Sequence, residues 1–437
     1  MNKQKLRPTI GLEIHGELRT NSKMFCGCPA DHFGKEPNTQ TCPVCLALPG
    51  ALPVPNIKAI EWTILIGLAL NCKINKNSKF DRKHYFYPDL PKGYQISQYD
   101  EPFCVNGYLD TTQGRVGITR VHLEEDTGKL QHSTVAGERV TLVDFNRSGV
   151  ALVEIVTEPD IVSASQAKEF AQKLQQILRH LEVTDADMEK GSLRLEANIS
   201  LGLDLGYKVE VKNLNSFKFV EKAIEYELER QKEIFEIGEI PLQETRGWSE
   251  AKNITISQRV KETSADYRYF PEPDIPPIEL TGAFIKEIEK KLPELPEVKR
   301  KRFEEDYGLR KDYAYFLSSN VVMSRFAEEV FKLSKQKAVD INKVAGYLVN
   351  QKMDISKLDS EKIVSEVSKQ KSDKIADDDQ LKEWVEEAVT ENQKAVEDYK
   401  KGKTNAISVI IGNVMRISRG KADASIVGKI AKEILKD

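Results

Sequence analysis

Apolar and polar residues alternate along roughly the first 290 residues of the chain, and turn-forming residues separate the alternating runs. An alternation with a period of two is typical of strands that have one buried and one polar face. The last ~140 residues are instead rich in lysine and glutamate with helical spacing. The pattern predicts an α+β protein, in which a mixed or antiparallel sheet with flanking helices is followed by all-helical C-terminal domains.

Two helices of the first region have clear start signals. Ser163 and Gln166 form a capping box in front of an apolar stripe that extends to Leu181. A second helix is predicted from about Ser216 to Phe235, again with one apolar stripe. Near the C-terminus, two shorter apolar stripes at 407–414 and 427–434 predict two more helices; Gly420 closes the first, and Asp423 caps the second.

Domain limits are predicted where this pattern breaks. The proline-rich stretch 271–277 cannot lie inside a helix or a central strand, and it marks the change from the alternating to the helical pattern. A second break lies at about 372–379, around an acidic run. We predict a first domain over 1–292, a helical domain over 293–370 and a helical tail over 371–437.

The polar faces of the predicted strands carry an unusual set of side chains. They are Glu13, His15 and Glu17 in one strand, Arg194, Glu196, Asn198 and Ser200 in another, and Lys208, Glu210 and Lys212 in a third. A run of three acids at 124–126 places at least one acid on either side of a further strand. Each of these faces could be the solvated side of an antiparallel sheet. Carboxylates beside an imidazole also suit a hard divalent cation such as Mg²⁺, and Mg²⁺ with nearby Lys and Arg is what phosphoryl transfer requires.

Composition narrows the class of protein. The formal net charge of the 437 residues is only -3, so the chain as a whole is not a basic nucleic-acid binder. No apolar run approaches the ~20 residues that span a bilayer, and the N-terminus has no signal-peptide pattern, so a cytoplasmic location is expected. Neither the P-loop motif nor the G-x-G-x-x-G motif occurs, so a site for ATP would be of another kind.

Four of the six cysteines fall within twenty residues, as Cys26, Cys28, Cys42 and Cys45. Two closely spaced pairs bring four thiolates together at little loop-closure cost, which predicts a zinc knuckle over 26–45. Four structural or free thiols are the alternative. Four thiolates leave no open position for water on the metal, so such a site is expected to be structural.

Several segments together resemble the B-subunit family of the tRNA-dependent amidotransferases. They are the segments 11–15, 37–45, 79–89, 93–98, 122–126, 143–147, 154–160, 189–194, 212–217, 243–246 and 266–274. The resemblance implies a cradle-shaped, kinase-like first domain that uses ATP and Mg²⁺ to phosphorylate the side-chain carboxylate of Glu-tRNA(Gln), Asp-tRNA(Asn) or both. Ammonia from a glutaminase partner then gives Gln-tRNA(Gln) or Asn-tRNA(Asn). It also implies a heterotrimer with the amidase (GatA-type) partner and the small (GatC-type) partner of such amidotransferases.

The resemblance also assigns site residues. The catalytic residues it implies are Glu13, His15, Glu124 and Glu125. Mg²⁺ is assigned to Glu13, His15, Glu125 and Glu210, and ATP to Glu210, Lys79 and Arg82. Some family members bind zinc at the position of the four cysteines, and this chain has all four.

The family's helical tail holds tRNA, and the composition of this tail is compatible with that role. Residues 394–437 contain ten lysines and arginines against five acids, a net charge of +5. Lys403, Arg416, Arg419 and Lys421 are predicted to contact tRNA phosphates, and a solvated helical face is the alternative. A zinc-containing tRNA-binding module without catalysis is the second hypothesis for the whole chain.

Overall fold

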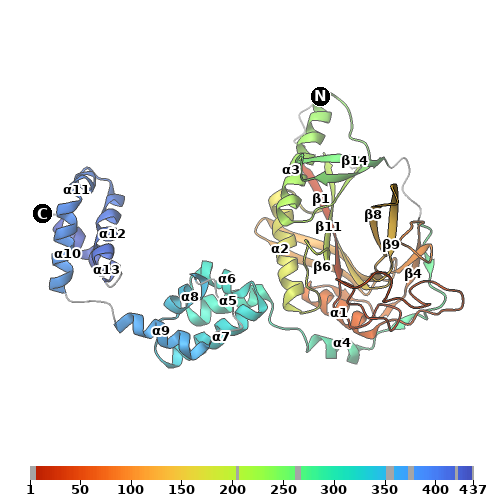
Figure 1. Ribbon diagram of the computed structural model, residues 1–437, viewed down its shortest axis with the longest axis horizontal. Coiled ribbons are helices and arrows are strands. Elements are labelled where there is room, and N and C mark those ends of the chain that lie inside the picture. The colour runs from red at the N-terminus through yellow and green to blue at the C-terminus, as the bar shows by residue number, and fades with distance from the viewer. Residues whose placement is uncertain are drawn as a thin grey trace. The chain divides into compact units, whose positions relative to one another are not determined.

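The structure, a computed structural model, describes residues 6–202, 206–260, 267–350, 359–372, 378–418 and 422–435. It consists of two compact units, Met1–Lys299 and Arg300–Asp437. The first combines a mixed sheet with helices and the second is helical, which confirms the predicted α+β class (Figure 1).

A nine-stranded sheet forms the centre of the first unit. Its order is β14 (Ile254–Val260), β13 (Glu244–Ser249), β12 (Val209–Lys212), β11 (Leu193–Leu201), β1 (Pro8–Glu17), β10 (Ala151–Thr157), β7 (Gly114–Glu125), β6 (Cys104–Thr111) and β2 (Lys73–Ile74). Only the pair β12 and β13 is parallel among these described strands. The first strand of the chain therefore lies at the centre, between two strands that are more than 130 residues away in sequence.

Helices cover one face of this sheet. They are α1 (Ile57–Ala69), which packs against β6 and β7, and α2 (Ala164–His180) and α3 (Phe217–Glu236), which pack against each other along one side of the strands in Figure 1. Leu12 and Ile14 of β1 point into the hydrophobic core on that side. The Ser163 hydroxyl accepts from the Gln166 amide at 3.1 Å, and the Gln166 side chain accepts from the Val162 amide at 2.9 Å. The Ser163 half of the predicted capping box is confirmed, whereas Gln166 accepts from the amide of Val162 and not from that of the N-cap Ser163.

Smaller elements lie around the other face of the sheet and its edges. They are a hairpin of β8 (Lys129–Val135) and β9 (Glu138–Asp144), a sheet of β15 (Phe270–Pro271), β4 (Asp81–His84) and β5 (Tyr94–Ser97), the pair β16 (Ile278–Glu279) and β3 (Asn77–Ser78), and α4 (Gly282–Glu289).

The proline-rich stretch does not end the first unit. Ile275 belongs to the core of this unit, and Glu272 is buried against Arg82. Packing of these side chains keeps the stretch inside the unit, which continues to Lys299.

The second unit contains two hydrophobic clusters, one from Phe303 to Val367 and one from Leu381 to Leu435. Its helices are α6 (Lys311–Ser318), α7 (Val321–Gln336), α8 (Ile341–Asn350), α9 (Ser360–Ser372), α10 (Asp378–Glu391), α11 (Gln393–Lys400), the 3-10 turn η2 (Thr404–Ala406), α12 (Ile407–Ile417) and α13 (Ala424–Ile434), and α5 (Pro296–Tyr307) crosses the limit between the units. The two C-terminal helices confirm the predicted stripes, whereas Gly420 lies outside the described residues. The domain limits at 292 and 370 stay predictions.

None of the helices in the described ranges is long and apolar enough to cross a membrane.

Candidate metal and catalytic site

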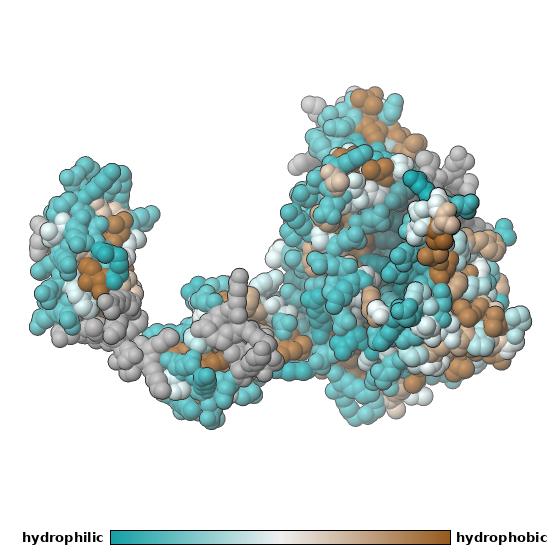
Figure 2. Space-filling view, in the orientation of Figure 1, coloured by the Kyte–Doolittle hydropathy of each residue, from teal (hydrophilic) through white to brown (hydrophobic). Residues whose placement is uncertain are grey.

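Strand register places the polar faces of five strands on one continuous surface. His15 lies opposite Glu154 of β10 on one side and opposite Arg194 of β11 on the other. Glu154 in turn lies opposite His122 of β7, and Asn198 of β11 lies opposite Glu210 of β12. Figure 2 shows that the first unit is hollowed beside the β8–β9 hairpin and that hydrophilic residues line the hollow. Residues from distant segments therefore share a single face opposite the helices.

The centre of this face is a cluster of carboxylates and imidazoles. His15 Nε2 lies 3.4 Å from Glu154 Oε2, 3.7 Å from Glu124 Oε1 and 3.8 Å from Glu13 Oε1. His122 Nε2 lies 3.1 Å from Glu154 Oε2 and 3.9 Å from Glu124 Oε2. Glu13, His15 and Glu154 form one group whose ligand atoms lie within 4.8 Å of one another, and His122, Glu124 and Glu154 form a second. Glu154 belongs to both groups, so we name these five residues the carboxylate–imidazole cluster.

The pKa values of the groups within the cluster are shifted in different directions. Burial and the neighbouring Glu154 carboxylate raise the pKa of Glu13 to about 7. Burial opposes protonation of His15, but the Glu154, Glu124 and Glu13 carboxylates outweigh it and raise the pKa of His15 to about 9. Burial also acts against the charge of Glu154, yet His122 and His15 lower its pKa well below the ordinary value. Crowded carboxylates of this kind are stabilised by added positive charge.

Lys83, on strand β4 outside the main sheet, places a positive charge near the cluster. Burial disfavours its charged form, but the Glu124 and Glu154 carboxylates raise its pKa above the ordinary value. Its ammonium group lies 5.3 Å from the centre of the Tyr267 ring and 6.0 Å from that of Tyr85. A lysine between carboxylates and aromatic rings is well placed to meet an anionic substrate.

The adjacent acids of β7 point to opposite sides. Glu124 lies in the cluster, where its carboxylate also accepts from the Ser97 hydroxyl at 3.0 Å. The Glu125 carboxylate instead accepts from Lys92 at 2.7 Å and from the Ile96 amide at 2.9 Å. It lines a pocket of ≈ 240 Å³ with Cys26 and Cys45. The structure therefore does not bring Glu125 to the metal group with Glu13 and His15, because successive side chains of a strand alternate.

Glu210 lies two strands from Glu13 on the same polar face. Its carboxylate accepts from the Thr245 hydroxyl at 2.8 Å and lies 3.4 Å from Lys212 Nζ. Lys212 also lies 2.9 Å from Glu196, which is opposite Glu13 in the register. Glu210 thus belongs to the margin of the face and not to the cluster.

Lys79 and Arg82, which the resemblance assigned to ATP, are engaged in ion pairs. Arg82 donates two hydrogen bonds to the Glu272 carboxylate, at 2.7 and 2.8 Å. Lys79 lies 3.0 Å from Asp100 and 3.7 Å from Asp81. Arg82 faces away from Lys83 because they are neighbours on one strand, so Lys83 is the β4 cation that approaches the cluster.

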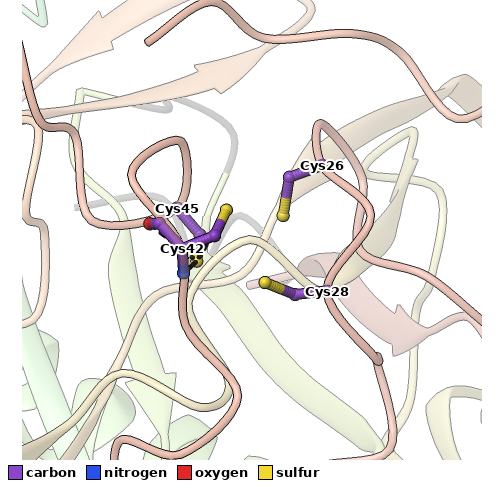
Figure 3. A group of neighbouring side chains, drawn as sticks. All are labelled: Cys26, Cys28, Cys42 and Cys45. Carbon is purple, nitrogen blue, oxygen red and sulfur yellow. Dashed lines mark hydrogen bonds between the residues drawn. The ribbon is translucent and has the colours of Figure 1, made fainter.

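The four cysteines converge as predicted. Their sulfur atoms lie within 4.8 Å of one another, with Cys26 and Cys28 on one segment and Cys42 and Cys45 on the facing loop (Figure 3). Lys23, which is fully buried, donates to Cys45 Sγ at 3.6 Å and to the Gln40 carbonyl at 2.8 Å. A hydrogen bond from Cys26, the Cys42 amide and Lys23 together lower the pKa of Cys45 to about 4, against the effect of burial.

Both clusters fit a divalent cation, each of a different kind. Four thiols at mutual contact distance fit tetrahedral Zn²⁺, and a buried lysine offsets part of the excess thiolate charge. Glu13, His15 and Glu154 offer two carboxylates and an imidazole, a set that suits a harder cation. Burial and, after it, repulsion from the Glu154 carboxylate raise the pKa of Glu13, and a bound cation would offset both effects.

Two of the four tail residues predicted to contact tRNA, Lys403 and Arg416, lie among the residues that the structure describes. Lys403 pairs with Asp398 at 3.0 Å and Arg416 pairs with Glu391 at 3.3 Å, and both cations are largely exposed. Arg419 and Lys421 lie outside the described residues.

The fold and the site define an α+β protein with a candidate cation cluster on the open face of its main sheet, a four-cysteine loop and a helical C-terminal unit. The family model of the GatB/GatE catalytic domain matches residues 8–286, and that of the GatB domain matches residues 327–435. The chain belongs to the GatB family.

Similar proteins extend over the whole chain. The B subunit of the aspartyl/glutamyl-tRNA(Asn/Gln) amidotransferase of Thermomicrobium roseum is 46% identical, with 98% of each chain covered. The proteins of the same name from Thermotoga maritima and Caldicellulosiruptor saccharolyticus are 45% and 44% identical, with 99% and 98% of each chain covered.

Glu154, His122 and Lys83 were not assigned a role from the sequence. Glu154 stands in an otherwise apolar strand, Ala151–Thr157, and a single acid in such a strand was the available signal. All three residues lie in segments that carry the family resemblance, so the resemblance marked their neighbourhood without giving their role.

Proposed function

We propose that the polar face of the main sheet is the site where ATP phosphorylates the side-chain carboxylate of Glu-tRNA(Gln) or Asp-tRNA(Asn), and where ammonia then gives the amide. The observation that carries the proposal is the convergence of Glu13, His15, His122, Glu124 and Glu154 on one hollowed face, with Lys83 beside them. The names of the similar proteins support the class of substrate.

The reaction requires positive charge near the phosphoryl group, because negative charge on the phosphate oxygens must be offset. A carboxylate oxygen of the aminoacyl group forms a bond to the terminal phosphorus of ATP, and ADP departs with the electrons of the broken phosphorus–oxygen bond. Ammonia then attacks the carbonyl carbon, inorganic phosphate departs and one ammonia proton is released to a base. Glu13, His15 and Glu154 would hold Mg²⁺, which offsets charge on the phosphate oxygens when bound. Lys83 supplies a fixed positive charge toward the same oxygens.

The chain depends on partners in this proposal. Ammonia comes from the amidase (GatA-type) partner, which acts as the glutaminase, and the small (GatC-type) partner completes the heterotrimer. The helical tail, through Lys403 and Arg416 with Arg419 and Lys421, contacts the tRNA backbone. The four cysteines hold zinc and stiffen the loop that borders the Glu125 pocket.

The test is amide formation on Glu-tRNA and Asp-tRNA by the chain assembled with its amidase partner. Product is expected only when ATP and Mg²⁺ are both present, with one ADP released per amide formed. His15→Ala is expected to abolish product and ADP release while tRNA binding persists. Full activity of that variant would remove the cluster from the proposal. A folded assembly that binds tRNA and zinc without ATP turnover would favour the non-catalytic module.

A further inference from the structure

Lys23, just before the first pair of cysteines, is a fully buried lysine. Its Nζ atom donates to the Gln40 carbonyl at 2.8 Å, to the Phe145 carbonyl at 3.3 Å and to Cys45 Sγ at 3.6 Å. Among the residues that the structure describes, no aspartate or glutamate forms an ion pair with it. Three acceptors match the three N–H groups of an ammonium ion, so its hydrogen bonds are complete although it has no carboxylate partner.

A buried ammonium ion is costly unless an anion lies close to it. Of the three contacts of Lys23, two are carbonyls, and only Cys45 can carry a negative charge. The Cys45 sulfur also accepts from the Cys42 amide at 3.1 Å, so two donors converge on it. Four thiolates around Zn²⁺ leave two negative charges in excess, and one lysine offsets one of them. Lys23 therefore requires an anion at position 45.

Lys23 also joins two segments that are distant in sequence, the loop 36–45 and the turn 143–149 that leads into β10. At the rim of the same contact, the Gln40 amide donates to Asn146 Oδ1 at 2.8 Å. The lysine is the fully buried and charged part of this contact. Loss of its counter-ion is therefore expected to loosen the turn from the loop.

The turn contacts both ends of the pair. The Ser148 hydroxyl donates to the Cys45 carbonyl at 3.3 Å, and the Gly149 carbonyl accepts from the amide of Met24, the neighbour of Lys23, at 2.7 Å. A Cβ atom built on Gly149 would lie 3.5 Å from Cys45 Cβ and 3.6 Å from Lys23 Cδ. Separation of the lysine from the cysteine would therefore displace the turn.

We propose that Lys23 is the internal counter-charge of the four-cysteine cluster and the residue that fixes its loop on the turn 143–149, and that it needs an anion at position 45 rather than the metal itself. Zinc then holds the loop in two ways, by closing it and by keeping a thiolate against the lysine. Groups that contact the ligands of a metal in this way orient them and raise the affinity for the metal. This inference goes beyond the proposed function and does not depend on the reaction at the polar face.

The first measurement is the zinc affinity of the full chain, by competition with a chelator. Lys23→Met is expected to weaken Zn²⁺ binding about tenfold or more. With Co²⁺ in place of zinc, the thiolate-to-metal absorption band is expected to shift in the same variant. Lys35→Met is the matched control, because Lys35 lies between the two cysteine pairs in an exposed ion pair with Asp31 at 3.2 Å. It is expected to change neither the affinity nor the band.

The second measurement separates the charge from the metal. Cys45→Asp and Cys45→Ser both remove a zinc ligand, but only the aspartate returns a negative charge to Lys23. In the presence of a chelator, Cys45→Asp is expected to have a melting temperature about 3 °C above that of Cys45→Ser, and slower hydrogen exchange in the turn 143–149. In the Lys23→Met background the order is expected to reverse, because the carboxylate is then buried without a partner.

Cys42 gives the control position for this comparison. No described hydrogen bond joins Lys23 to the Cys42 sulfur. Cys42→Asp is therefore expected to have no advantage over Cys42→Ser that depends on Lys23.

Each outcome decides the proposal. Unchanged zinc affinity in folded Lys23→Met would overturn the role of the lysine toward the metal, as would a wild-type chain that binds no zinc. A Cys45→Asp variant no more stable than Cys45→Ser would overturn the pairing, and this comparison stands even if Lys23→Met does not fold. The same order of the two variants in both backgrounds would overturn it as well. Amide formation is not measured here, so the proposed function fails separately, through full transamidation by His15→Ala.

Discussion

The two candidate metal clusters of the first unit are assembled in opposite ways. The four cysteines lie within one segment of twenty residues, and a single loop brings them together. The carboxylate–imidazole cluster takes its residues from β1, β7 and β10, which span positions 13 to 154. The first cluster depends on local loop geometry and the second on the pairing of three strands. A change in strand register would therefore dismantle only the second.

The two clusters also differ in the chemistry of their side chains. Four thiols with buried Lys23 beside them make a closed, soft site, which suits a structural ion. The carboxylate–imidazole cluster lies on a hollowed polar face with unequal pKa values, which suits a site that exchanges ligands. We expect damage to the cysteine cluster to reduce stability and damage to the other cluster to reduce activity.

The largest effect is expected from Glu154→Gln. The substitution keeps the volume but removes the charge that both His15 and His122 face, at 3.4 and 3.1 Å. Amide formation on Glu-tRNA is expected to fall on the order of 100- to 1,000-fold, as for loss of a preorganised charge. The measurement is the rate of Gln-tRNA formation at saturating ATP.

Glu158→Gln is the matched control, since Glu158 follows the same strand and accepts from the Thr119 hydroxyl at 2.7 Å, outside the cluster. It is expected to keep its activity. Equal loss in both variants, or near-normal activity of Glu154→Gln, would contradict the assignment of the cluster.

The next effect is on stability, in Cys45→Ser. Loss of one thiol from the four-cysteine cluster is expected to abolish zinc binding and to lower the melting temperature, while the folded fraction keeps its ATP-dependent activity. Because the unfolding entropy grows with the size of the unit, here Met1–Lys299, a loss of about 3 kcal/mol would lower the melting temperature by roughly 5 °C. Metal analysis and calorimetry check both parts. Cys72→Ala, at a buried cysteine outside the cluster, is expected to leave the metal content unchanged; zinc retained in Cys45→Ser would contradict the ligand set.

The contrast between the clusters also explains which of their residues could be predicted from the sequence. The cysteine spacing predicted the convergence of the four thiols, because all four residues lie within one short segment of the chain. Alternation predicted the polar face that carries Glu13 and His15, but it left open which of the acids at 124–126 shares that face, and it contains no information on which strands pair. Glu154 and His122 join them only because β10 lies between β1 and β7. The resemblance grouped Glu125 with Glu13 although it points to the other side of β7, and it grouped Glu210 with them although β11 lies between β12 and β1.

The adjacent acids Glu124 and Glu125 test which side of β7 carries the cation site, with an expected effect of about tenfold on the Mg²⁺ requirement. Glu124→Gln removes a carboxylate that lies 3.7 Å from His15, whereas Glu125→Gln alters the pair with Lys92 on the other side of the strand. The Mg²⁺ concentration for half-maximal amide formation is expected to rise about tenfold in Glu124→Gln, a loss of ~1.4 kcal/mol in binding. It is expected to stay unchanged in Glu125→Gln, whatever the effect of that variant on rate. A larger rise in Glu125→Gln than in Glu124→Gln would place the cation on the other side of the strand.

The smallest effect is expected in the tail, where charges are neither buried nor clustered. Lys403 and Arg416 each have an ion pair at the surface, and such pairs contribute little to stability. Alanine at both positions is expected to leave the melting temperature almost unchanged and to weaken tRNA binding a few-fold, with a salt dependence that falls by about 1 for each lost phosphate contact. Lys335→Ala, an exposed lysine of α7, is the control. Unchanged tRNA affinity and salt dependence in the double variant would leave these side chains as a solvated helical face. Such an outcome would show that in this chain only charges brought together by the fold carry function.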